Sequence, residues 1–176
     1  MQKIILAIGS SRTTKIWKNT AFTWEGLVKR LQTTARTTET QGEYRNFSKN
    51  QQDAIKDVGG FVGGKLREGK RRAGYIESRY LLTLDADYAT EDFIDQLFFF
   101  HDFTWCVYST HKHTPEKPRY RLLIPLSRPC GPDEYEAVAR KVAEDIGIDL
   151  FDDTTYQPHR LMYWPSTSID GEYVLE

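Results

Sequence analysis

The order of apolar runs between residues 79 and 166 constrains the fold more than any other feature of this chain. Two stretches, 90–103 and 132–147, repeat apolar residues at helical spacing, with Thr90 as a candidate N-cap and Gly147 as a candidate C-terminal cap. Four short runs rich in β-forming residues are predicted strands: 80–86, 104–110, 119–126 (ended by Pro125) and 160–166 (stopped by Pro165). The predicted order is therefore β-α-β-β-α-β.

This order is that of a ferredoxin-like or RRM-like α+β fold, in which both helices cover one face of an antiparallel sheet and leave the other face open. We assign residues 61–176 to this core. Residues 1–60 are predicted to form a mainly helical extension packed on the core, because 21–33 has an amphipathic helical pattern; the initial MQKIILAIGSS is predicted as a strand and turn. The glycine pairs of VGGFVGG (58–64) indicate a turn or a close backbone approach, and the turn is favoured.

Composition excludes several classes of protein. With 39% hydrophobic residues the chain is too apolar for disorder, and no stretch approaches the roughly 18 apolar residues of a membrane span. No signal peptide is recognisable, so a soluble cytoplasmic protein without a membrane partner is expected. Cys106 and Cys130 form neither a disulfide framework nor a C-x-x-C metal motif.

Charge is balanced over the whole chain but not along it. There are 24 Lys and Arg residues against 25 Asp and Glu residues, which by itself indicates no polyanionic partner. The segment 65–79, KLREGKRRAGYIESR, is nevertheless strongly basic, while acids gather at 90–95 and 143–153. Such a basic run is either a solvated loop or a contact for phosphates.

Two carboxylates at the end of the first core strand are the leading chemical signal. Asp85 and Asp87 follow the apolar residues of 80–84 and, being two apart on a strand, point to the same side. Hard oxygen ligands in this arrangement suit Mg²⁺ or Mn²⁺. A third carboxylate is expected from the acidic loop before the last strand, where Asp149, Asp152 and Asp153 are candidates.

The next two strands carry further polar side chains. Ser109, His111 and His113 share one side of the second strand, and Arg119 and Arg121 share one side of the third. Arginine forks suit phosphate oxygens, although isolated arginines are commonly surface ion pairs. Either histidine could equally be a hydrogen-bonded edge residue.

Three motifs in this order carry a family resemblance. The Asp85–Asp87 pair, the Ser109-Thr110-His111 triplet and the Phe151-Asp152 dipeptide resemble the catalytic signature of the archaeo-eukaryotic primase superfamily. They are most similar to the primase-polymerase domains of phages, plasmids and integrated mobile elements. The resemblance covers roughly residues 60–176, and the stretches 59–72 and 157–166 also resemble the mobile-element branch.

The resemblance implies a set of site residues. Asp85, Asp87 and Asp152 would hold two Mg²⁺ or Mn²⁺ ions, and His111, supported by Ser109, would contact the phosphates of an incoming NTP or dNTP. His113 and Asp153 remain alternatives to His111 and Asp152. The remaining nucleotide or template contacts would be Arg119, Arg121, Lys65 and Arg160.

The implied activity is that of a DNA primase or polymerase. Metal-dependent nucleotidyl transfer would proceed on a single-stranded DNA template, with a helicase module in the same or another chain as a further partner. The basic segment beginning at Lys65 would follow the template backbone, and Tyr75, Tyr88 or Trp164 would stack a base.

Two other functions are compatible with parts of the pattern. His111 and His113 could form the H-x-H site of a rolling-circle-type endonuclease, although Lys112 stands where such sites usually have an apolar residue, and Asp85 and Asp87 would have no role. The chain could alternatively be a non-catalytic RRM-like nucleic-acid-binding module. Two acids on its sheet would then repel phosphates unless a metal intervened.

Overall fold

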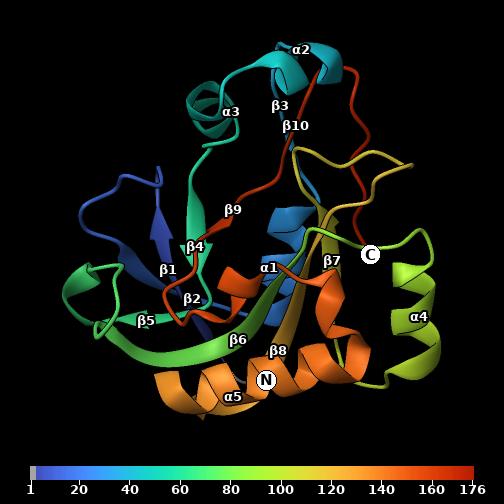
Figure 1. Cartoon of the computed structure of the whole chain (residues 1–176). Helices are drawn as coiled ribbons and strands as arrows, with labels where there is room; N and C mark the ends of the chain where they lie inside the picture. The colour runs from blue at the N-terminus through green and yellow to red at the C-terminus, as the bar shows by residue number, and fades with distance from the viewer. Residues whose placement is uncertain (1–2) are drawn as a thin grey trace.

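The computed structural model describes residues 3–176, so Met1 and Gln2 of the predicted first strand lie outside the described residues. The fold is α+β, as predicted, with strands in two antiparallel sheets and one parallel two-stranded pairing (Figure 1). The first sheet has the order β5 (Gly64–Leu66), β6 (Ile76–Ala86), β8 (Tyr120–Cys130), β7 (Cys106–Ser109). The second has the order β2 (Lys18–Phe22), β1 (Ile4–Gly9), β4 (Gly60–Val62), β9 (Met162–Tyr163). The parallel pair joins β10 (Ser166–Thr167) to β3 (Ala35–Arg36).

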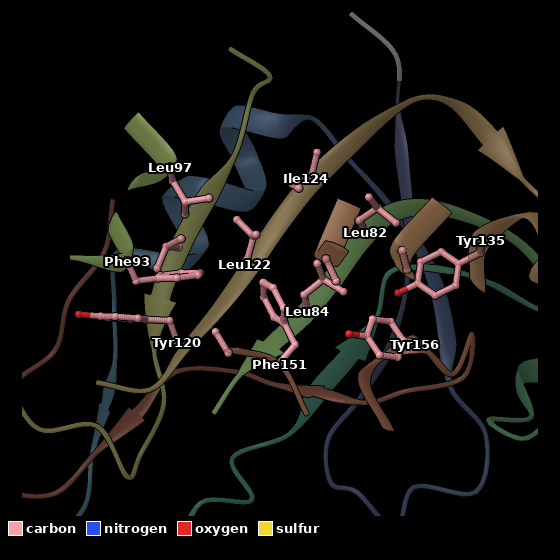
Figure 2. Packing of buried hydrophobic residues seen from close by; sticks show 14 of the residues in the cluster. Leu82, Leu84, Phe93, Leu97, Tyr120, Leu122, Ile124, Tyr135, Phe151 and Tyr156 are labelled. Atoms are coloured by element: carbon pink, nitrogen blue, oxygen red, sulfur yellow. The ribbon is translucent and has the colours of Figure 1, made fainter. Parts of the chain in front are cut away.

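The β5-β6-β8-β7 sheet contains the predicted split βαβ arrangement. Helix α4 (Phe93–Phe100) connects β6 to β7, and β8 lies between these two strands before leading into α5 (Pro132–Ile146). Both helices pack on one face of the sheet, where Phe93 and Leu97 of α4 and Tyr135 of α5 meet Leu84 and Leu122 (Figure 2). Burial of this apolar face fixes the strand register.

The last predicted strand is not in this sheet, which corrects the expected topology. Strand β9 pairs with β4, whereas β5 pairs with β6 on the side away from β8. The part of β6 that follows its pairing with β5 has its edge occupied by the segment 148–156. The backbone N–H of Asp152 donates there to the carbonyl of Asp85 (2.9 Å). The hydroxyl of Thr155 accepts from the N–H of Asp85 (2.8 Å). No edge hydrogen bonds of Asp85 are left there for a further strand.

The glycine pairs of 58–64 mark a close backbone approach, so the favoured turn was wrong. Gly60 lies in β4 and Gly64 in β5. A Cβ atom at Gly60 would lie 2.3 Å from the carbonyl oxygen of Met162, and one at Gly64 would lie 2.3 Å from that of Ser78. Only glycine permits this spacing.

The N-terminal segment is not mainly helical as predicted. It contains the expected amphipathic helix α1 (Trp24–Leu31), capped by Thr23, and also α2 (Gln41–Asn46) and α3 (Lys49–Ile55). However, β1 and β2 supply half of the β2-β1-β4-β9 sheet. The prediction missed β2 because its residues are largely exposed and show no apolar alternation.

This segment also covers the sheet face that the prediction left open. Leu6 of β1 and Leu27 and Leu31 of α1 form one buried cluster with Leu81 of β6 and Leu123 of β8.

Some element boundaries differ from the predictions. The N-cap of α4 is Asp92 rather than Thr90. Strand β8 continues past Pro125 to Cys130, because its pairing with β6 shifts register there. Gly147 ends α5 as predicted, with φ at 137°. Within residues 3–176, no helix has the length and apolar character needed to cross a bilayer.

Candidate active site

A cavity of about 570 Å³ brings three of the predicted carboxylates together. Asp85 is the penultimate residue of β6, Asp87 follows two residues later, and Asp152 lies beside them because its N–H donates to the Asp85 carbonyl. Asp149 and Asp153 are not among the residues that line this cavity. Of the three candidates in the acidic loop, the structure therefore places Asp152 in the site.

The predicted arginines pair with these carboxylates. Arg121 lies opposite Asp85 in the β6–β8 register, and its Nε donates to Asp85 Oδ1 (2.9 Å). Arg119 Nη1 lies 3.1 Å from Asp87 Oδ1. Arg160 Nη2 lies 3.3 Å from Asp85 Oδ2 and 3.9 Å from Asp152 Oδ1. Each carboxylate of the cavity thus faces at least one guanidinium group.

The donor chemistry of the cavity suits a hard divalent cation, but its present arrangement favours arginine. Within the described residues 3–176, no three acidic, histidine or cysteine side chains converge closely enough to hold a metal ion. The reason is visible at Asp85, whose two oxygens face Arg121 and Arg160. An ion bound by Asp85, Asp87 and Asp152 would have to replace these guanidinium groups.

His111 also lines the cavity and is held from two sides. Its Nε2 lies 2.8 Å from Glu39 Oε1 and its Nδ1 lies 2.9 Å from Ser166 Oγ, while the ring of Tyr44 packs at 4.3 Å. Burial lowers the pKa of His111 even though the contact with Glu39 opposes this shift. Because an ionised Glu39 only accepts, Nε2–H donates to it and Nδ1 of the neutral ring accepts from Ser166.

The structure separates His113 and two other predicted residues from the cavity. Nδ1 of His113 accepts from the N–H of Arg119 (3.2 Å), and its ring packs on Tyr120. Ser109 Oγ accepts from the N–H of Val174 (2.9 Å). Lys65 on β5 pairs with Glu77 (2.7 Å). None of the three lines the cavity, so of the two motif histidines it is His111 that belongs to the site; His159 lines the cavity as well.

The predicted base-stacking aromatics are not in the cavity either. Trp164 is buried against Phe61 and lies under Arg30, whose guanidinium carbon is 4.0 Å from the ring centroid. The ring of Tyr75 is covered by Arg72 at 4.2 Å. Tyr88 is exposed but does not line the cavity.

Several cavity residues come from elements to which the sequence assigned no site role. Lys49 and Lys56 belong to α3 and its C-terminal cap, and Arg12 belongs to the loop after β1. All three contact Asp53, at 3.4, 2.8 and 3.0 Å respectively. Burial disfavours the charge of Asp53, but Lys56 and, after it, Lys49 lower its pKa to about 2. The seven-residue spacing of Lys49 and Lys56 places them on one helix face. This spacing was the signal in the sequence that could have identified them as a pair of site cations.

Comparison with known families adds a further finding. The model of the VapE N-terminal domain family matches residues 1–176. The chain belongs to this family. VapE-like proteins are mobile-element proteins, which confirms the mobile-element part of the resemblance in the sequence. No curated protein and no solved structure gives a significant match to the chain.

The cavity of this VapE N-terminal domain has an excess of positive charge. Among its described lining residues, eight cations stand against the three carboxylates: Arg12, Lys49, Lys56, Arg71, Lys112, Arg119, Arg121 and Arg160. Such a surface attracts polyanions, and its volume is in the usual range for a small-molecule site. The three carboxylates lie among these cations in the same cavity.

Proposed function

We propose that this VapE N-terminal domain is the primase-polymerase domain of a mobile-element replication protein. It would join NTPs or dNTPs on a single-stranded DNA template with Mg²⁺ or Mn²⁺, and a helicase module would act in the same or another chain. The observation that supports this best is the meeting of Asp85, Asp87 and Asp152 with Arg119 and the other cations in one cavity.

The arginines supply the electrostatic part of the reaction. In the proposal, Arg119, Arg121 and Arg160 exchange their carboxylate partners for phosphate oxygens of the nucleotide. This keeps each guanidinium paired while it frees the three carboxylates. Cations fixed in this way offset charge that builds up on the transferred and leaving phosphates. When bound, divalent ions would activate the primer 3′-hydroxyl and stabilise the leaving pyrophosphate.

His111 takes a positioning role in this proposal. Both of its ring nitrogens already have partners, Glu39 and Ser166, so the imidazole has no free nitrogen for a phosphate. The hydroxyl of Ser166 borders the same cavity. Because the single hydroxyl hydrogen of Ser166 is donated to His111, His111 would orient the Ser166 oxygen to accept a hydrogen bond from a sugar hydroxyl or a base N–H of the nucleotide.

The two alternative functions receive less support. An H-x-H nuclease needs both imidazoles at one metal, whereas His111 bonds Glu39 and His113 packs on Tyr120 outside the cavity. An RRM-like module needs an open sheet face, but α1 and β1 cover that face at Leu81 and Leu123.

The test is incorporation of labelled nucleotides on single-stranded DNA, with and without primer, in Mg²⁺ and in Mn²⁺. Asp85→Asn and Asp87→Asn are expected to lower the rate about a hundredfold or more, since each removes charge at the reacting centre. Asp153→Asn is the matched control, because Asp153 is exposed and does not line the cavity.

The outcomes of this test are distinct. Incorporation lost only in the cavity variants supports the polymerase, and product without primer makes it a primase. No product from folded parent protein with either metal would overturn the proposal, and DNA binding indifferent to chelator would then favour the non-catalytic module.

A further inference from the structure

A second hollow, of about 320 Å³, adjoins the carboxylate cavity, and every charged residue described in its lining is a cation. Two segments form it, the loop 12–17 after β1 and the stretch 70–72 after β5; we call them the basic arm. The hollow is lined by Arg12, Thr13, Thr14, Lys15, Trp17, Lys70, Arg71 and Arg72. Arg12, Thr13 and Arg71 also line the carboxylate cavity, so the two hollows meet at these residues.

Three of the five described cations of the basic arm have no acidic partner, whereas Arg12 pairs with Asp53 and Lys70 with Glu68. Among the described residues, Lys15, Arg71 and Arg72 take part in no ion pair, whereas Arg140 and Lys141 on α5 pair with acids of their own helix. Arg71 is the clearest case. Its Nε is buried without a hydrogen-bond partner, and burial lowers the pKa of its guanidinium. A partly buried cation without a carboxylate is costly unless an anion joins it.

The backbone of the basic arm is rigidly connected. The N–H of Trp17 donates to the carbonyl of Gly69 (2.8 Å), and Arg71 lies over the Trp17 ring at 5.2 Å. Gly69 has a φ of +63°, and a Cβ there would lie 2.6 Å from the carbonyl oxygen of Trp17. The two segments can approach this closely only because residue 69 is glycine. A surface already held in place loses little freedom on binding.

The arrangement fits a chain of phosphates better than a single nucleotide. One nucleoside triphosphate can occupy the carboxylate cavity, but a cationic hollow that continues outward from it needs a longer polyanion. We propose that the basic arm binds the phosphate backbone of single-stranded DNA where the strand passes out of the carboxylate cavity. This inference rests on the proposed polymerase function and adds the path of the nucleic-acid partner.

The inference also changes which residues of the basic sequence run are involved. Lys65 pairs with Glu77, and Arg67 donates to the carbonyl of Gly74, so both are engaged elsewhere. Lys15, which lies fifty residues before Lys65 in the chain and takes part in no described ion pair, supplies a cation in their place.

The test measures the affinity of a fluorescent single-stranded oligonucleotide for the full chain at several salt concentrations, in chelator and without nucleotide. Arg71→Ala/Arg72→Ala should make the log–log salt slope shallower by about 1.4, or about 0.7 for each lost phosphate contact. The same relation gives roughly a twenty-fold loss of affinity at about 0.1 M salt. Arg140→Ala/Lys141→Ala removes the same charge from the exposed face of α5 and should leave the slope unchanged.

Gly69→Ala provides a second variant that keeps every charge. It should weaken binding because it separates the two segments, provided that thermal unfolding shows the variant to be folded. Equal salt slopes for the parent and Arg71→Ala/Arg72→Ala, or a parent that binds no single-stranded DNA, would overturn the inference. If the variants lose DNA binding while the parent incorporates no nucleotide, the basic arm is confirmed as a DNA-binding surface and the polymerase proposal is overturned.

Discussion

The Nε2 atom of His111 lies 2.8 Å from Oε1 of Glu39, which joins the motif histidine to a carboxylate 72 residues earlier in the chain. Glu39 also accepts from the hydroxyl of Thr37 (2.7 Å) and is almost fully buried. A carboxylate in this position fixes the tautomer and the ring orientation of the imidazole. Glu39 is thus a positioning residue of the site, although it does not line the cavity.

Glu39→Gln should lower the pKa of His111 further. The neutral amide removes the charge that partly opposes the effect of burial on the imidazolium. The pKa can be followed by NMR titration of the ring nitrogens. Glu136→Gln on the outer face of α5 is the control and should leave the His111 titration unchanged; an unchanged titration in Glu39→Gln would contradict the assignment.

Arg121→Met should destabilise the protein by about 3 kcal/mol, because it leaves the buried carboxylate of Asp85 without its closest cation. Asp85→Asn in the same chain should recover part of this loss, since the unpaired charge is then gone. Chemical denaturation of the two single variants and the double variant measures the coupling. Strictly additive free energies of unfolding would show that Arg121 and Asp85 do not interact.

Gly60→Ala should destabilise the protein by about 1–3 kcal/mol, because its Cβ would collide with the carbonyl oxygen of Met162 across the β4–β9 pair. Gly42→Ala is the matched control. Its Cβ would meet nothing closer than 3.9 Å in α2, so its effect should be neutral or slightly stabilising. The comparison is read from thermal unfolding, and similar losses in both variants would count against the close approach at β4.

Asp53 should contribute an acid-sensitive part of the stability. Its folded pKa of about 2 lies below the ordinary value of 3.8, so its contribution is complete above about pH 4 and is lost as the pH falls toward 2. Asp53→Asn should therefore show a smaller decrease of melting temperature than the parent over this interval. Parallel curves for the two proteins would mean that Lys56, Lys49 and Arg12 do not stabilise the carboxylate.

The central strands and the position of the carboxylates were predictable because both follow from the residue pattern within a single strand. In β6, Leu84 faces the apolar core while Asp85 points to the cavity, and a period of two is enough to see this. The fate of Ser109 was not predictable in the same way. The side chain of Ser109 lies on the expected side of the strand, but its hydroxyl accepts from the backbone N–H of Val174 near the C-terminus and not from a group of the cavity.

Strand β2 and the cavity residues of the N-terminal segment could not be predicted from the sequence for a related reason. Strand β2 has an exposed sequence without alternation and exists because it pairs with β1. Arg12 and Lys49 enter the cavity only through the packing of the N-terminal segment on the sheet. Sequence spacing describes neighbours within one element, whereas these contacts join elements far apart in the chain.

The position of β4 between β1 and β9 has a practical consequence for anyone who shortens this protein. A cut before residue 61 would divide β4, remove its partner β1 and strip the cover from Leu81 and Leu123. It would also discard Glu39, Arg12, Lys49 and Lys56. A fragment that retains all three motifs of the primase resemblance would therefore be a poor reagent, and activity assays on it would say little about the intact chain.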